Sequence, residues 1–272
     1  MQRHPEIPKT ASASRHERYW LLLFVALAAA LRLTQLGERP FHHDESIHAW
    51  FAYQIFQGQA YRFDPMFHGP WLYWSNALVY VLLGASDFTA RLLPALASTA
   101  MLLPLWMLRR ELGVIGWKVT AAFVILSPTL VYYGRFLGHD SYCALFTLLW
   151  VALAFAWHRW PLPRHALAFG VVTGLFFATK AVAFIHIGLF AIFVGLVLAL
   201  DTFAPRWPRA KLVDLAWRWL LQRRAQLGLA LLSAGAVYMA LYSSFFTHWP
   251  GIIDGVVGTL DYWSGQHVQP RI

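Results

Sequence analysis

The sequence predicts an all-α, polytopic membrane protein, built as a bundle of about seven membrane-spanning helices. Apolar residues make up 58% of its 272 residues, and charged residues only 13%. A water-soluble domain with this composition would expose large apolar patches, which soluble monomers rarely carry. The single cysteine, Cys143, lies in an apolar stretch and offers neither a disulfide nor a cysteine metal site.

Seven apolar segments are long enough, or nearly so, to cross about 30 Å of hydrocarbon as helices. They lie at 19–36, 88–108, 119–134, 141–157, 166–179, 181–200 and 225–246. The third and fifth are short for a full crossing. A cleaved signal peptide is the alternative for the first segment, because charged residues precede it and small residues lie near its end. In either case the loop that starts at Glu38 faces outward.

The charges of the loops predict the orientation, because cytoplasmic loops carry an excess of Lys and Arg. With a cytoplasmic N-terminus, 15 of the 22 basic residues fall inside and eight of the 13 acidic residues fall outside. The excess of basic residues behind the net charge of +9 therefore marks the loops that stay on the cytoplasmic side of the plasma membrane and contact anionic lipid. It is no indication of nucleic acid as a partner.

The first outer loop, 37–87, is predicted to contain two interfacial helices. One spans about 44–57, and the second is the aromatic-rich apolar stretch 71–83. This stretch is too short to cross the membrane, and a crossing here would turn the basic loops outward. Trp and Tyr rings favour the headgroup level, so we expect a helix in the interface.

Two further loops complete the expected organisation, a single membrane domain over 1–272. The cytoplasmic loop 201–224 has Leu and Trp among basic residues and reads as an interfacial amphipathic helix or, equally, as a solvated basic loop. The outer segment 247–272 stops without a closing element, which suggests a chain truncated at its C-terminus.

The first outer loop opens with two carboxylates among three histidines, Phe41-His42-His43-Asp44-Glu45-Ser46-Ile47-His48. Ionisable groups at a membrane boundary are costly and mark functional sites. On a helix Asp44 and His48 share a face. We predict Asp44 and Glu45 as the catalytic carboxylates, with His43 and His48 in support. The alternative is that Asp44 only caps the helix.

A second outer acid, Asp140, stands at the entrance to the fourth span, and His68 precedes the second interfacial helix. Asp44, His68 and Asp140 would together form a mixed oxygen and nitrogen site for a divalent cation, Zn²⁺ or Mn²⁺, with Mg²⁺ also open. Taken singly, His68 and Asp140 also fit an interface residue or a helix cap.

Three isolated basic residues, Arg91, Arg135 and Lys180, sit at outer span ends against the prevailing charge bias. Phosphate oxygens accept charge-assisted hydrogen bonds from such cations where little water competes. We predict that these residues bind the phosphate of a lipid-linked donor. Snorkelling of each side chain to the headgroups is the alternative.

Several strings of the sequence resemble known membrane enzymes. The layout resembles GT-C membrane glycosyltransferases of the protein mannosyltransferase and aminoarabinose transferase type. The strings also resemble a prokaryotic family of flippase-activity-associated proteins of surface glycosylation. The matching strings begin at Phe41-His42-His43-Asp44-Glu45, Phe67-His68-Gly69-Pro70, Ser86-Asp87-Phe88-Thr89-Ala90-Arg91, Phe177-Ala178-Thr179-Lys180, Ser243-Ser244-Phe245-Phe246-Thr247 and Tyr262-Trp263-Ser264.

The resemblance implies transfer of a sugar from a polyprenyl-phosphate donor to a glycan or protein acceptor on the outer face of the membrane. By that analogy Asp44 is the catalytic or metal-positioning carboxylate, Asp140 the second acidic position and Arg91 a phosphate contact. At the position of His68 the aminoarabinose transferases carry a glutamate, which leaves the metal open. Two other functions remain: a lipid-linked glycan flippase accessory or transporter, and an inactive glycosyltransferase-like scaffold.

The predicted orientation can be tested by labelling single cysteines in a Cys143→Ser background. A cysteine replacing Asp64 should react with a membrane-impermeant maleimide added to intact cells. A cysteine replacing Lys211 should react only after the cells are opened. Labelling of Lys211→Cys in intact cells would reverse the orientation and place the carboxylate cluster inside.

Overall fold

The computed structural model describes residues 15–203 and 212–265, and every regular element within these ranges is helical. The elements are α1 (Arg15–Leu33), α2 (His43–Phe56), η1 (Pro65–Phe67), α3 (Trp71–Leu83), α4 (Asp87–Ala100), α5 (Leu102–Met107), α6 (Arg109–Leu126), α7 (Pro128–Gly134), α8 (Asp140–Arg159), α9 (Pro163–Phe177), α10 (Val182–Phe203), α11 (Leu212–Gln222), α12 (Arg224–Tyr242), α13 (Pro250–Ile253), η2 (Asp254–Gly258) and α14 (Thr259–Gly265). The all-α class is confirmed.

Each of the seven predicted spans coincides with a helix or a pair of helices. In the described residues, four are long and apolar enough to cross a membrane: α4 with α5, α8, α10 and α12. A fifth is the pair α6 and α7, bent by 58°. The predicted first and fifth spans fall short of this standard. α1 carries charges near both ends, and the 15 residues of α9 are about 22 Å long at about 1.5 Å per residue.

The helices predicted in the loops are also present. α2 and α3 are the two helices expected in the first outer loop. α11 forms part of the basic loop, where a helix was one of two alternatives. Lys211 and the end of the chain from 266 lie outside the described residues.

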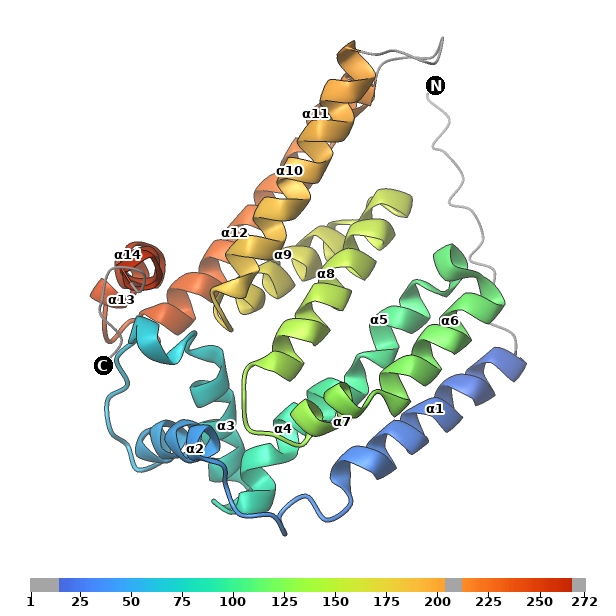
Figure 1. Ribbon diagram of the computed structural model, residues 1–272. Helices are drawn as coiled ribbons and strands as arrows, with labels where there is room; N and C mark the ends of the chain where they lie inside the picture. The colour runs from blue at the N-terminus through green and yellow to red at the C-terminus, as the bar shows by residue number, and fades with distance from the viewer. Residues whose placement is uncertain (1–14, 204–211, 266–272) are drawn as a thin grey trace.

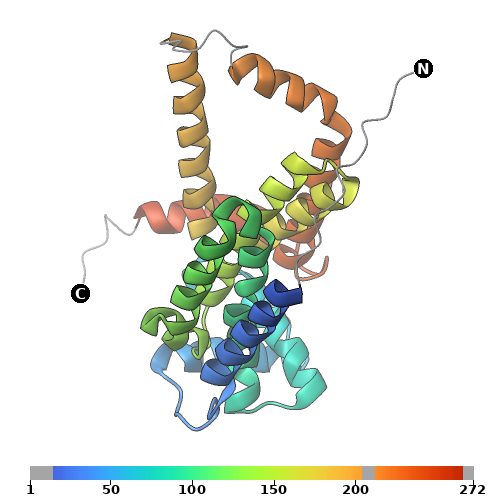
Figure 2. The same ribbon diagram turned by 90° about the vertical axis from the view of Figure 1, so that its right-hand side faces the viewer.

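One group of helices contains α1, α5, α6 and α7, a second contains α8, α9 and α12, and both α4 and α5 pack against α8 (Figure 1). α4 contacts α1, α3 and α8, while α9 packs between α8 and α12. The main core is shared by α2, α3, α4, α8, α9 and α12. α2 and the start of α4 lie at the lower end in Figure 1, and the long helix α10 projects from the bundle at the upper end, as Figure 2 shows.

The α1 helix is joined to the break between α6 and α7 by a buried arginine. Pro128 has no N–H, so the carbonyl of Val124, four residues earlier, loses its helical donor. The Arg32 guanidinium, fully buried, donates to this carbonyl at 2.8 Å and to the Ser98 hydroxyl at 2.7 Å. Gly134 lies against both Ser98 and Arg32 and has no room for a side chain. The Val124 carbonyl freed by the break therefore accepts a hydrogen bond from a guanidinium on another helix.

Replacing Arg32 by Leu should leave the Val124 carbonyl buried without a donor. Hydrogen bonds of charged groups contribute about 1.5–3 kcal/mol each, so we expect a marked fall in the thermal unfolding temperature in detergent. Arg18, on the same helix but exposed, is the matched control, and Arg18→Leu should change the unfolding temperature little. Equal effects of the two substitutions would contradict the role assigned to Arg32.

Candidate active site

The end of the bundle that holds α2 and the start of α4 is organised by a buried ion pair between these two helices. The guanidinium of Arg91 on α4 contacts both carboxylate oxygens of Glu45 on α2, at 2.7 and 2.9 Å. The two side chains are 1% and 0% exposed. The remaining N–H groups of Arg91 donate to the carbonyls of Leu36, Arg39 and Pro40 at 2.7–3.2 Å. All five donors of this arginine are used.

Glu45 joins two further segments to the pair. Its carboxylate accepts from the backbone N–H of His42 at 3.0 Å, which completes a capping box, and from that of Leu137 at 3.0 Å. Arg39 adds a third cationic contact at 3.0 Å. Burial alone would raise the pKa of the Glu45 carboxyl, but the hydrogen bonds from Arg91, His42 and Leu137 outweigh it and hold the pKa below its usual range.

These contacts correct two expectations. Arg91 was predicted to bind a donor phosphate, but its guanidinium is sealed and has no free donor. Glu45 was predicted as a catalytic carboxylate, but it faces the protein interior with both oxygens occupied. The pair positions the site and does not line it.

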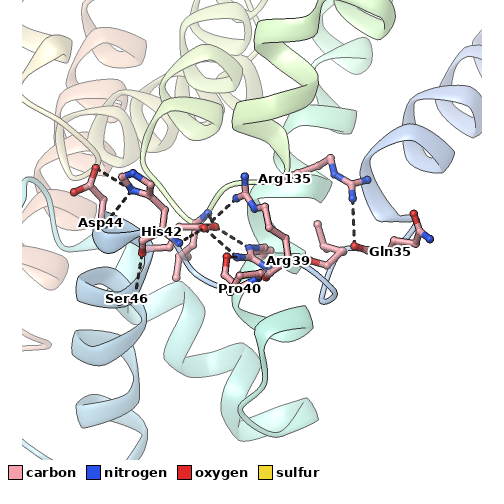
Figure 3. A network of polar contacts seen from close by, with 11 residues as sticks. Gln35, Arg39, Pro40, His42, Asp44, Ser46 and Arg135 are labelled. Atoms are coloured by element: carbon pink, nitrogen blue, oxygen red, sulfur yellow. Dashed lines mark hydrogen bonds and ion pairs between the residues drawn. The ribbon is translucent and has the colours of Figure 1, made fainter.

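Arg135 also has a structural position. Its guanidinium donates to the carbonyls of Leu31 at 2.9 Å and Thr34 at 2.7 Å, at the end of α1, and to that of Gln35 at 3.3 Å. Figure 3 shows Arg135 reaching across to Gln35, with Arg39 and His42 in the neighbouring part of the network. These carbonyls occupy the side chain that was expected to contact phosphate, so Arg135 acts as a cap for α1.

The other predicted site residues meet in one cavity of about 650 Å³. Asp44, Asp140 and Lys180 line it, together with the histidines His43, His48 and His68. Its remaining walls are formed by His42, Ile47, Met66, Phe67, Tyr132, Tyr133, Phe136, Gly138 and His139. The cavity therefore combines two carboxylates, one ammonium group and an aromatic wall.

Asp44 is free to act in this cavity because another residue caps the helix. The N-cap of α2 is His42, whose side chain accepts from the backbone N–H of Asp44 at 3.3 Å. The Asp44 side chain is 61% exposed and lies 3.7 Å from the His42 ring. The capping alternative for Asp44 is thus wrong.

Backbone hydrogen bonds clamp the segment that follows His68 to the segment that precedes Lys180. The N–H of Gly69 donates to the carbonyl of Thr179 at 3.0 Å, and that of Trp71 donates to the carbonyl of Ala178 at 2.9 Å. A Cβ at position 69 would collide with the Ala178 backbone, so only glycine permits this approach. Lys180 follows the clamp directly, and its ammonium group donates to the carboxylate of Asp140, at the start of α8, at 3.0 Å.

Three histidines form a continuous row along the cavity. His139 lies edge-to-face against His48 and His68, with ring centroids 5.1 and 5.4 Å apart. His68 in turn stacks on Trp263 of α14 at 5.6 Å. Burial lowers the pKa of His48 and of His68 to about 4, and it lowers that of His139 well below the ordinary value. All three imidazoles are therefore neutral near pH 7.

The predicted metal ligands share the cavity but not a coordination site. In the described part of the chain, no three His, Cys, Asp or Glu side chains are grouped so that they could hold an ion. Asp140 is paired with Lys180, and His68 is stacked on Trp263. The residues do not fit a bound metal in this arrangement.

Sequence reasoning missed two members of the site, Tyr73 and His139. Tyr73 is fully buried on α3 and contacts His48 at 3.0 Å. His139 precedes Asp140 and is 2% exposed. The available signals were the aromatic richness of 71–83 and the position of His139 beside a predicted ligand.

Comparison with solved structures identifies a similar fold. The crystal structure of ArnT from Cupriavidus metallidurans bound to undecaprenyl phosphate matches with a TM-score of 0.65 and 20% identity, over 92% of this chain and 44% of ArnT. The chain thus spans less than half the length of ArnT. No protein-family model and no curated protein sequence matches it. At this identity the likeness establishes a GT-C-like helical fold.

Neutralising Glu45 should lower the stability of the protein strongly, whereas neutralising its neighbour Asp44 should change the stability little. Glu45→Gln leaves the buried Arg91 without a counter-charge, and losing one partner of a buried pair costs about 3–5 kcal/mol. Asp44→Asn alters an exposed group and should change the unfolding free energy by less than about 0.5 kcal/mol. Thermal and urea unfolding in detergent measure both, and similar losses would refute the anchoring role.

The Glu45→Gln variant should also change how the stability of the protein depends on pH. Because the folded pKa of Glu45 is lowered, its stabilisation is present above the pKa of the unfolded chain and is lost as the pH falls through the folded value. Glu45→Gln should therefore lose less stability than the parent between neutral and strongly acidic pH.

Proposed function

We propose that the protein transfers a sugar from a polyprenyl-phosphate donor to an acceptor on the outer face of the membrane. The observation that carries this proposal is the meeting of Asp44, Asp140 and Lys180, from three separate segments, in one cavity of a GT-C-like fold. The bound undecaprenyl phosphate of ArnT supports a polyprenyl phosphate as the lipid partner.

Lys180 is the cation suited to the donor phosphate. Arg91 and Arg135 donate to backbone carbonyls, whereas the Lys180 ammonium lines the cavity and is held by Asp140 alone among the described residues. Its side chain is 24% exposed, so a phosphate has access to it. An ammonium stabilises the negative charge that develops on the leaving phosphate as the bond to the sugar breaks.

The rest of the cavity suits a sugar and its acceptor. Tyr132, Tyr133 and Phe136 form an aromatic wall, and most binding pockets combine such walls with a few placed polar groups. Asp44 stands exposed across the same cavity and can orient the acceptor hydroxyl. The neutral histidines add no charge that would compete with Lys180 for the phosphate.

Transfer should be measured with the purified chain in nanodiscs, using a synthetic polyprenyl-phosphate hexose and membrane-extracted glycan as acceptor. Lys180→Met removes one charge-assisted contact of about 1.5–3 kcal/mol, so donor affinity should fall about ten- to a hundredfold. Lys118→Met, at the predicted cytoplasmic side, is the control and should bind the donor as the parent does.

The chemical step is tested separately with Asp44→Asn, for which Asp87→Asn is the exposed control outside this cavity. Asp44→Asn should abolish turnover while donor binding and thermal stability persist. A parent that binds the donor but transfers no sugar would favour the flippase accessory or the inactive scaffold.

A further inference from the structure

We propose that His48 is the proton acceptor of the transfer reaction and that Tyr73 is a positioning residue that fixes its tautomer. This inference rests on the proposed function and assigns roles within the same site. It follows from a chain of two hydrogen bonds that runs from the backbone through Tyr73 to His48.

The Tyr73 hydroxyl fixes the direction of both hydrogen bonds. Its oxygen lies 2.6 Å from the carbonyl oxygen of Phe67 and 3.0 Å from Nδ1 of His48. A carbonyl oxygen can only accept, so the single hydrogen of the hydroxyl is committed to Phe67. The contact with His48 must then be an Nδ1–H that donates to the Tyr73 oxygen.

The tautomer of His48 follows directly. A neutral imidazole carries one N–H, and here it is on Nδ1, so Nε2 holds a free lone pair. Within the described residues Nε2 has no hydrogen-bond partner, and the ring lines the cavity. The side chain thus lines the cavity with a ring nitrogen that can take up a proton.

Tyr73 is a rigid support for this arrangement. It is fully buried, and its ring packs against Phe51 and Tyr61 at centroid distances of 5.4 Å and against His139 at 5.8 Å. A group held by packing on several sides keeps its hydroxyl in one place. His48 is held on a second side by the edge of His139.

Burial outweighs the nearby charges and keeps the His48 imidazole neutral between turnovers. Burial disfavours the imidazolium most and Lys180 adds to this, whereas Asp44 and Glu45 from α2 and Asp140 from α8 favour it. His48 therefore enters each cycle neutral. Glu45 and Asp140 are paired with Arg91 and Lys180, so Asp44 is the nearby carboxylate left to stabilise the proton when it arrives. Asp44, more exposed and one helical turn away, remains to orient the acceptor.

The step balances without a further reactant. The acceptor oxygen forms a bond to the anomeric carbon as its hydrogen moves to Nε2 of His48. The bond between that carbon and the phosphate oxygen breaks, and its electron pair leaves with the polyprenyl phosphate beside Lys180. The proton then passes from His48 to solvent.

The base role is tested with His48→Asn. The Asn amide can still donate to Tyr73 but has no acceptor at the position of Nε2. General-base catalysis contributes about 10²- to 10⁴-fold, so kcat should fall at least about a hundredfold while donor affinity and thermal stability stay near those of the parent. Transfer within about threefold of the parent would overturn the base role.

The positioning role is tested by ¹⁵N NMR of histidine-labelled protein in nanodiscs, with the His48 signals assigned from their loss in His48→Asn. The parent should show Nδ1 protonated and Nε2 bare, and Tyr73→Phe should show a mixture of tautomers with kcat reduced at an unchanged KM. Tyr61→Phe, which alters a tyrosine packed on Tyr73, should change neither.

The possible outcomes separate the two proposals. A parent with its His48 proton on Nε2, or a tautomer unchanged in Tyr73→Phe, would overturn the role of Tyr73. If the parent transfers no sugar, the proposed function and the base role fail together. The NMR experiment then still decides whether Tyr73 fixes the imidazole.

Discussion

The buried ion pair of Glu45 and Arg91 is the interaction on which the cavity end of the protein depends. Charges removed from water are costly unless every donor and acceptor is satisfied, and here carbonyls before α2 and the amide of Leu137 complete the set. The pair thereby ties the loop before α2, the helix α4 and the loop before α8 together. Since Asp44 and Asp140 begin the two flanking helices, their separation is set by a contact outside the cavity.

Local composition explains how much of the fold could be predicted. Apolar runs and polar loops depend on neighbouring residues, so the positions of the helices, including α2 and α3, followed from the sequence. The bias of loop charges also grouped Asp44, His68, Asp140 and Lys180 at one end of the bundle, and these residues do line one cavity. Their individual roles stay predictions.

The errors concern side chains whose role depends on distant partners. An arginine at the end of a span reads the same in sequence whether it binds a ligand or backbone carbonyls. The acceptors of Arg91 lie 46 to 55 positions away in the chain, and those of Arg135 lie 100 to 104 positions away. Glu45 was misassigned for the same reason. The sequence shows two adjacent carboxylates, but in the structure Glu45 is buried against Arg91 and Asp44 lines the cavity.

The buried Arg32 also has a consequence for biogenesis. Two of its acceptors, Ser98 on α4 and Val124 on α6, are synthesised after α1, so of the acceptors in the folded protein only the Ala28 carbonyl lies on its own helix. The contacts that bury this side chain therefore form only after α4 and α6 have been made. Docking of the first helix is thus coupled to residues that lie 66 and 92 positions later in the chain, which makes it a cooperative, late event in folding.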